Sequence, residues 1–289
     1  MSSGTPLANL TALETVLLVE GQARVVIAPA RGGMVTRFEV DGAPVLYLDA
    51  ASLVDPTKNV RGGIPVLFPS PGPLKGERFL RDGKSGRMKQ HGFARQEAWS
   101  VIAQTEREVT LELASNDATR AQYPWELVAR LRYALAGTTL TVETSLTNRS
   151  PTPMPFALGF HPYFHVPDAE KAQARIDTDA TRAFDNVTKT MVEVHSFLDL
   201  TQKEVDLHLA DHKAHSATLR RGDRDRIVVS ADPDLRRWVV WTLAGKDFVC
   251  LEPWTAPADA LNTGEGLLEI APGASRTLTM TLAHVAGAS

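Results

Sequence analysis

Residues 127–147, with the sequence LVARLRYALAGTTLTVETSLT, contain two runs in which apolar and polar side chains alternate. In residues 127–135 every second side chain is apolar, which places these side chains on one face of an extended chain. Residues 139–147 also alternate, with threonine, serine and glutamate on the polar face. Ala136-Gly137 separates the two runs and is a turn signal. The stretch therefore predicts an antiparallel β-hairpin with one buried face.

Paired strand signals continue along the whole chain, whereas long amphipathic helical patterns are absent from the sequence. Three further hairpins are predicted from two short runs each: residues 38–40 with 44–48, residues 99–103 with 109–113, and residues 267–270 with 277–282. Strand signals spaced by about 8–12 residues favour a large antiparallel sandwich or barrel over a parallel-sheet fold. Because no change in composition marks a boundary, we expect the 289 residues to form a single all-β domain.

Residues 69–90 are rich in proline, glycine and charge, and they predict a long surface loop of the kind that often binds ligands. Within this segment, residues 74–89 carry six lysines and arginines against two acidic residues. This cationic cluster has two interpretations, a surface that attracts phosphate or an ordinary solvated face.

Composition argues against several classes of protein. The net charge of −3 lacks the basic excess of a domain that neutralises nucleic-acid phosphates. No window approaches ~18 consecutive apolar residues, and residues 1–10 lack the pattern of a secretory leader. Cys250 is the one cysteine of the sequence, so no internal disulfide forms. We therefore expect a cytoplasmic protein with no nucleic-acid or membrane partner.

Residues 157–165, ALGFHPYFH, place large apolar side chains on one face of a strand and His161, Tyr163 and His165 on the other. On a strand the two histidines lie ~13 Å apart, which is too far to share one metal ion. We therefore expect no metal at this pair. His161 is either a structural histidine with a satisfied hydrogen bond or a group that faces a cleft.

Residues 248–254, FVCLEPW, continue a row of apolar side chains into a carboxylate, because the two-residue period aligns Phe248, Cys250 and Glu252. Burial in such a row would raise the pKa of Glu252 toward the range that proton-transfer catalysis requires. The alternative is a strand-end glutamate that pairs with a lysine or an arginine. Cys250 lies in an apolar strand and is expected in the core.

Two segments combine glycine with cationic or imidazole side chains: RGGIP at residues 61–65 and HGFAR at residues 91–95. Neither has the spacing of a phosphate-binding loop or of a dinucleotide fingerprint, so we expect no nucleotide cofactor. Glycine beside arginine and histidine allows the backbone to approach a ligand closely while the guanidinium forms hydrogen bonds.

Taken in order, these two segments, residues 159–164 (GFHPYF) and residues 252–254 (EPW) resemble the aldose 1-epimerase, or mutarotase, superfamily. The similarity spans a core of roughly residues 15–283 and is strongest to the branch that includes the hexose-6-phosphate mutarotases. It implies a large antiparallel β-supersandwich, as in galactose mutarotase, with a sugar bound in a cleft on a concave sheet.

The resemblance also implies catalytic roles for two residues. His161 matches the general acid and Glu252 the general base of ring opening, and we expect the two to face each other across one sugar-sized cleft. Pro162 departs from the small polar residue that is usual after the histidine. This chemistry requires neither a metal nor a cofactor.

Substrate-binding roles follow from the same resemblance. Arg61 and His91 match residues that hold sugar hydroxyls, and Asp206 matches an aspartate that binds the sugar. Asp223 or Asp225 could fill the role of Asp206. In a hexose-6-phosphate mutarotase, Arg61 and Arg95 would clamp the phosphate with charge-assisted hydrogen bonds.

Three functions follow, and the sequence favours the first two. One is an aldose 1-epimerase for free sugars, and the second is a hexose-6-phosphate mutarotase. The third is a carbohydrate-binding β-sandwich without turnover, in which Trp254 and Trp125 would stack on sugar rings. A binding module has no need of an acid beside a base, which argues against the third.

Overall fold

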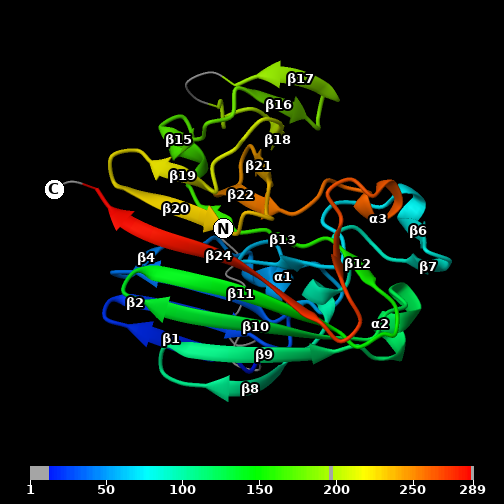
Figure 1. The fold of residues 1–289 in the computed structure, drawn as a ribbon. Helices are drawn as coiled ribbons and strands as arrows, with labels where there is room; N and C mark the ends of the chain where they lie inside the picture. Colours follow the sequence, from blue (N-terminus) through cyan, green and yellow to red (C-terminus); the bar gives the residue numbers. More distant parts are fainter. Residues whose placement is uncertain (1–12, 195–197, 288–289) are drawn as a thin grey trace.

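The computed structural model describes residues 13–194 and 198–287, so the predicted absence of a leader in residues 1–10 concerns a segment outside the described residues. Strands dominate the described part of the chain (Figure 1), which confirms the all-β prediction. The helices among these residues are short, and none is long and apolar enough to cross a membrane. The helices are α1 (Ala50–Val54), α2 (Asp117–Gln122), α3 (Ala260–Thr263) and the 3₁₀ turns η2 (Lys75–Glu77), η3 (Ala94–Gln96) and η4 (Asp168–Glu170).

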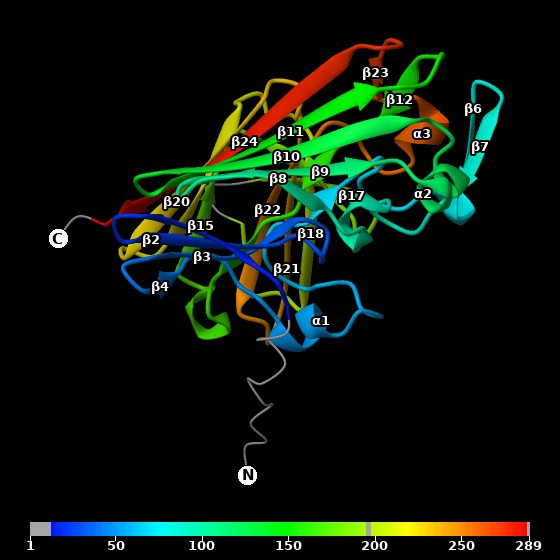
Figure 2. The same ribbon diagram turned by 90° about the horizontal axis from the view of Figure 1, so that it is seen from below.

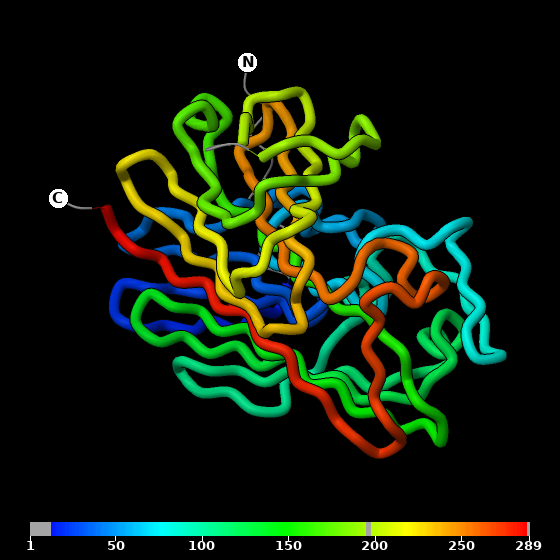
Figure 3. The backbone as a smooth tube through the Cα atoms, turned by 45° about the horizontal axis from the view of Figure 1, so that its top comes forward, coloured from blue at the N-terminus to red at the C-terminus, as the bar shows by residue number. Residues whose placement is uncertain are grey.

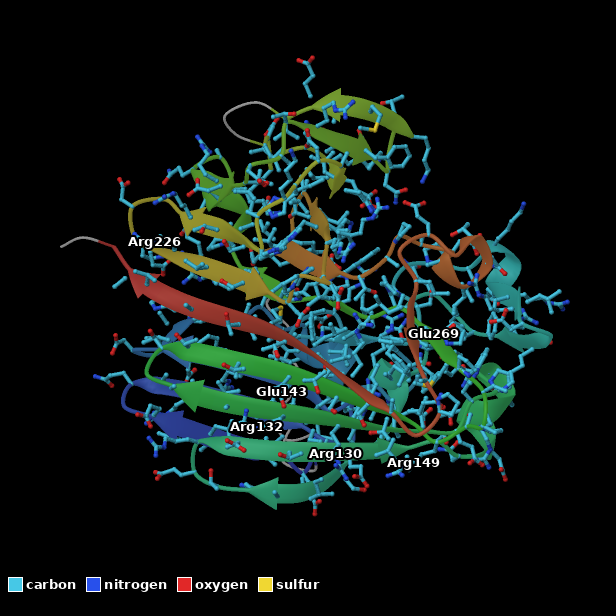
Figure 4. The ribbon with its side chains drawn as sticks, viewed as in Figure 1. Arg130, Arg132, Glu143, Arg149, Arg226 and Glu269 are labelled. Atoms are coloured by element: carbon cyan, nitrogen blue, oxygen red, sulfur yellow. The ribbon has the colours of Figure 1, made fainter. Side chains whose placement is uncertain are left out.

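One large antiparallel sheet is built around the hairpin that the sequence predicts in residues 127–147. Its strand order is β15 (Ala174–Asp177), β19 (Ser216–Arg221), β20 (Asp225–Ala231), β24 (Ser275–Ala286), β11 (Thr139–Asn148), β10 (Leu127–Ala136), β9 (Glu108–Ala114) and β8 (Ser100–Gln104). The apolar face of β10 is buried, as its alternation predicts. Its polar face carries Arg130 and Arg132, which pair with glutamates of β9 on the outer surface (Figure 4).

The second large sheet holds the segments that carry the predicted chemistry. Its strand order is β17 (Thr190–Glu193), β16 (Arg182–Asp185), β18 (Glu204–Leu209), β21 (Arg237–Leu243), β22 (Phe248–Trp254), β13 (Gly159–Phe160) and β5 (Val66–Leu67), with β14 (Tyr163–His165) also paired to β22. Every residue of β22 is buried. The sheet therefore holds β22 as a central strand between β21 and the two short strands β13 and β14.

Smaller sheets complete the layers. They are β1 (Val16–Glu20), β2 (Ala23–Ala28), β3 (Met34–Val40) and β4 (Ala43–Pro44); β12 (Met154–Phe156) with β23 (Leu268–Ile270); and β6 (Arg78–Arg81) with β7 (Lys84–Arg87). Figure 2 shows the sheet of β8–β11 and β24 as one layer, with β1–β4 and the strands β18, β21 and β22 on its other side. One hydrophobic cluster joins these layers and includes Leu131, Phe38, Phe160 and Val240.

The hairpins predicted at residues 38–48 and 99–113 are confirmed as β3–β4 and β8–β9. The hairpin predicted from residues 267–270 and 277–282 is wrong, because β23 pairs with β12 whereas β24 pairs with β11 and β20. Asn148 explains the separation, since its side chain donates to the carbonyl of Ile270 and its backbone N–H donates to Ala274. The turn therefore passes the chain from one sheet to another.

The prediction of a surface loop over residues 69–90 is also wrong in part. The segment contains the β6–β7 hairpin, and Phe79 and Met88 are buried there. Phe79 stacks on Trp125 with ring centroids 6.2 Å apart, which ties the hairpin to the core. Two short strands of four residues each give too little alternation to stand out within a segment so rich in charge.

A buried ion pair connects β19 and β20 to other sheets. The Arg221 guanidinium binds the Asp225 carboxylate at 2.6 Å and also donates to the carbonyls of Pro44, at 2.8 Å, and His165, at 3.0 Å. The His284 ring lies 3.1 Å from the same carboxylate. Since Pro44 belongs to β4 and His165 to β14, one guanidinium links three sheets.

We expect Arg221→Ala to lower the free energy of unfolding by roughly 3–5 kcal/mol, because Asp225 would stay buried without its cationic partner. Arg220→Ala is the matched control, since Arg220 lies on the same strand, is 49% exposed and pairs with Asp177. The control should lose no more than about 1 kcal/mol. Urea denaturation of both variants measures the difference, and equal losses would contradict a structural role for the Arg221 ion pair.

Candidate active site

One face of the second large sheet gathers polar side chains into two rows across neighbouring strands. The rows, given in the order β18, β21, β22, are His208, Val239 and Glu252, and Asp206, Trp241 and Cys250. Directly opposed residues of an antiparallel sheet have their side chains in contact on one face. The register of three strands therefore brings the carboxylates of Asp206 and Glu252 to the same face.

His161 joins the first row through the register between β22 and the short strands beside it. The pairs that flank this position are Gly159 with Trp254 and Tyr163 with Cys250. The same register places His161 opposite Glu252, at the gap between β13 and β14. The backbone N–H of His161 does not bond to β22. It donates to the carbonyl of Pro65 at 3.0 Å. The Nδ1 atom of His161 lies 3.3 Å from Oε1 of Glu252.

The Glu252 carboxylate is 2% exposed. Burial raises its pKa well above the ordinary value, and the nearby Asp206 acts in the same direction. The indole N–H of Trp254 donates to Oε2 at 3.1 Å and opposes the rise. The apolar row of residues 248–254 predicts this raised pKa. The alternative, a pair with a lysine or an arginine, is not found for Glu252 among the described residues.

The His161 ring stacks on Tyr163 with centroids 4.6 Å apart and planes 6° apart. Burial lowers the pKa of His161 well below its ordinary value, and His91, Arg95 and Arg61 lower it further. Its Nδ1 is buried and has no hydrogen-bond partner in the part of the chain that the structure describes. Leu158, Phe160 and Phe164, which alternate with His161, are fully buried, as the sequence predicts.

Burial disfavours both charged forms, and a proton held by His161 and Glu252 has two arrangements, a neutral pair and an ion pair. The neutral pair and the ion pair differ only in the position of that proton. The expectation that the two residues face each other across a cleft is wrong, since their nearest atoms are 3.3 Å apart. They lie side by side on one wall, because neighbouring strands carry them.

His91 has one tautomer imposed by the backbone. The Gly72 N–H donates to Nδ1 at 3.0 Å, so the proton of the neutral ring is on Nε2. Burial lowers the pKa of His91 to about 3, and Arg95 contributes to the decrease. The backbone of His91 has φ 73°, a left-handed conformation that is unusual for a residue other than glycine. His91 is thus a neutral hydrogen-bond donor, and its Nε2 lies 3.1 Å from the side-chain amide of Gln90, which also lines the cavity.

These groups open onto a cavity of about 420 Å³, a size that is typical of small-molecule sites. All six predicted site residues line it: Arg61, His91, Arg95, His161, Asp206 and Glu252. Of the alternatives to Asp206, Asp225 is held in the buried ion pair with Arg221, and Asp223 does not line the cavity. Asp206 itself is bound by the side chains of Asn186, at 2.7 Å, and His208, at 3.3 Å.

Two guanidinium groups at this cavity have no carboxylate within 4.0 Å among the described residues. Arg61 lies 6.0 Å above the Trp241 ring, and Arg95 donates to the carbonyl of Gln90 at 2.9 Å. Burial lowers the pKa of Arg95. Both side chains therefore present positive charge to the cavity without an internal counter-ion.

The cationic cluster of residues 74–89 lies elsewhere, since none of its six lysines and arginines lines the cavity. Four of these six residues belong to the β6–β7 hairpin. Figure 3 shows this cyan hairpin apart from the yellow-green β16–β17 hairpin, whose turn lines the cavity. Arg87 pairs with Glu77 at 3.0 Å, and Lys84 lies 4.6 Å from the Trp125 ring. The solvated-face interpretation fits these contacts.

Sequence reasoning missed several residues of the cavity. Glu204 and His208 lie two residues on either side of Asp206, so the period of β18 could have identified them. Asn186 and Lys189 come from the turn between β16 and β17, for which the sequence has no signal. Lys189 donates to the side-chain oxygen of Asn186.

The two tryptophans named for sugar stacking differ in their surroundings. Trp254 lines the cavity and contacts the rings of His91 and His208. Trp125 is 1% exposed and its indole donates to Pro153, so the prediction that it stacks on a sugar is wrong. Its role is to pack against Phe79 and Tyr123.

Comparison with known proteins identifies relatives of this fold and sequence. The sequence model of the family described as Aldose 1-epimerase matches residues 14–283. The solved structure of Slr1438 from Synechocystis sp. PCC 6803 is 38% identical with a TM-score of 0.91, covering 95% of this chain and 96% of that chain.

Two further relatives are more distant. A galactose mutarotase related enzyme from Lactobacillus acidophilus is 21% identical with a TM-score of 0.75, covering 96% of this chain and 99% of that chain, and it supports the predicted supersandwich fold. A protein from Cenchrus ciliaris named "Putative glucose-6-phosphate 1-epimerase" is 27% identical over 277 residues, which are 83% of this chain and 80% of that protein.

Proposed function

The chain belongs to the aldose 1-epimerase family, and from this premise we propose that it interconverts the α and β anomers of an aldose by acid–base opening and reclosure of the sugar ring. The contact between His161 and Glu252 on the wall of the cavity carries the proposal. An imidazole and a carboxylate that share one proton can take a proton and give one in the same step.

The chemistry runs through two oxygens of the sugar. Glu252 takes the proton of the anomeric hydroxyl while His161 gives a proton to the ring oxygen, and the bond between C1 and the ring oxygen breaks. Rotation about the bond between C1 and C2 presents the other face of the aldehyde. Reclosure with the roles of Glu252 and His161 reversed yields the other anomer and restores the proton to the pair.

The side-by-side placement of the pair suits this reaction better than a placement across the cleft. The anomeric and ring oxygens are both bonded to C1, so the groups that act on them must also be close together. His91 offers a fixed N–H and Asp206 offers a carboxylate, and we assign them to the sugar hydroxyls. The ion-pair form of His161 and Glu252 is the reactive one.

A phosphorylated aldose is a second candidate substrate, and Arg61 and Arg95 favour it. Two guanidinium groups without carboxylate partners at one cavity suit a phosphate dianion, which accepts charge-assisted hydrogen bonds. The name of the Cenchrus ciliaris relative points to the same substrate class. A phosphate beside the two arginines would also cancel their effect on the pKa of His161 and favour its protonated form.

The experiment that tests the proposed function follows anomer equilibration of freshly dissolved α-glucose, α-galactose and glucose 6-phosphate by NMR exchange or polarimetry. We expect the protein to accelerate equilibration of at least one of them above the spontaneous rate. Binding without acceleration of any of the three would favour the non-catalytic carbohydrate-binding module.

We expect Glu252→Gln and His161→Asn each to lower the rate at least ~10²-fold, because each removes the group that takes or gives the proton. The matched controls are Glu112→Gln and His215→Asn, which alter surface residues outside the cavity. Full activity of either site variant, with circular dichroism that matches the wild type, would contradict the assignment.

The pH dependence of kcat/KM should be bell-shaped, with its acid limb below the ordinary pKa of histidine and its alkaline limb above the ordinary pKa of glutamate. The lowered pKa of His161 puts the acid limb, where the pair gains a second proton, below about 6.5. The raised pKa of Glu252 puts the alkaline limb, where the pair loses its proton, above about 4.3. The spontaneous rate is subtracted at each pH. An acid limb at or above pH 6.5 would contradict the shared-proton pair.

Arg61→Ala and Arg95→Ala separate the two candidate substrates. If the natural substrate carries a phosphate, each variant should lose about 10–10²-fold in kcat/KM for glucose 6-phosphate, the worth of a charge-assisted hydrogen bond, and much less for glucose. Arg78→Ala in the β6–β7 hairpin is the matched control and should leave both substrates unchanged. Equal losses for glucose and glucose 6-phosphate would argue against a phosphate clamp.

A further inference from the structure

We propose that His161, Cys250 and Glu252 form a binding site for Zn²⁺ and that the bound ion blocks the proposed proton-transfer pair. The three residues offer an imidazole nitrogen, a thiol sulfur and a carboxylate oxygen that all lie within 4.8 Å of one another, and all three are buried. Binding of the ion is independent of the proposed function, whereas the block on turnover rests on it.

The spacing of the donor atoms is close to that of a tetrahedral zinc site. Tetrahedral zinc bonds of about 2.0–2.3 Å place two ligand atoms about 3.3–3.8 Å apart. Nδ1 of His161 and Oε1 of Glu252 are 3.3 Å apart, and the sulfur of Cys250 is no more than 4.8 Å from either. A shift of about an ångström by the thiol side chain would complete three sides of the coordination shell.

His161 supplies independent evidence for a ligand at this position. Its side chain is 8% exposed, and Nδ1 forms no hydrogen bond within the described part of the chain, although Oε1 of Glu252 lies 3.3 Å away and the Cys250 sulfur within 4.8 Å. Buried polar atoms in proteins almost always have a partner. A cation would use the lone pair of Nδ1 when the ring proton is on Nε2.

The donor set balances the charge of a zinc ion. Zinc binds cysteine as the thiolate and glutamate as the carboxylate, so binding releases to solvent the protons that these two groups carry. The thiolate and the carboxylate together cancel the two charges of the ion, which favours Zn²⁺ in a buried site.

The ion has a route to the site through the cavity. His161 and Glu252 line the cavity, whereas Cys250, their neighbour on the same face of the sheet, is fully buried and does not line it. The fourth coordination position therefore faces the cavity and is available to water. Arg61 and Arg95 repel a cation, so we expect weaker binding than at a dedicated structural zinc site. A bound metal occupies the nitrogen and the oxygen that would move the substrate's protons.

Cobalt(II) tests the site without reference to activity, because a thiolate ligand gives a charge-transfer band in the near ultraviolet. Cys250 is the one cysteine of the sequence, so that band can come from no other residue. We expect one equivalent of Co²⁺ to produce the band together with the visible absorption of a tetrahedral site, and one equivalent of Zn²⁺ to abolish both. Absence of the thiolate band would overturn the proposal.

Variants show which residues hold the ion. Cys250→Ala and Cys250→Ser should remove the band, and Cys250→Ala should weaken zinc binding in calorimetry at least ~10-fold. Glu252→Gln should weaken it to a similar extent, while His215→Ala outside the cavity should have no effect. Unchanged zinc affinity in both cysteine variants would overturn the site.

Inhibition is measured last. Zn²⁺ should slow anomer interconversion at least ~10-fold in the wild type, a chelator should reverse the effect, and Cys250→Ala should be less sensitive. Bound zinc without inhibition would overturn the proposed block. A thiolate band in a protein that interconverts no anomer would support the metal site and overturn the proposed function, so the two failures are distinguishable.

Discussion

The contact between His161 and Glu252 depends on one register, that of β22 with the short strands β13 and β14. This register places an imidazole opposite a carboxylate in the interior of a sheet, where both side chains are almost fully buried. Burial makes both charged forms costly, so it lowers the pKa of His161 and raises the pKa of Glu252. A shift of β22 by one residue would turn Glu252 to the other face and remove the pair.

The positive charges around the pair connect substrate binding to acid strength. Arg61 and Arg95 lower the pKa of His161, so an empty cavity disfavours the imidazolium form. A substrate with a phosphate beside these arginines would offset that effect and favour transfer of the shared proton to His161. A neutral sugar would leave the arginines uncompensated. In the proposed reaction, the charge of the substrate would therefore adjust the strength of the acid, which is a physical argument for the phosphorylated candidate.

The sequence predicted those parts of the fold and the candidate site that depend on local alternation. The hairpin of residues 127–147 and the buried row of residues 248–254 both follow from a two-residue period. Strand partners depend on contacts distant in sequence, which is why the pairing of residues 267–270 with 277–282 was wrong. The side-by-side placement of His161 and Glu252 needed the register, and Lys189 reaches the cavity from a turn that has no distinguishing pattern.

Cys250 lies beside Glu252 because side chains two residues apart on β22 point to the same face of the sheet. Burial raises the pKa of the thiol well above its ordinary value, so Cys250 does not compete for the proton of the pair in the absence of a metal. A divalent cation changes this balance, because it favours the thiolate and the carboxylate at once. The buried row that raises the pKa of Glu252 thus also places a soft ligand beside the proposed acid and base, where one cation could bind all three groups.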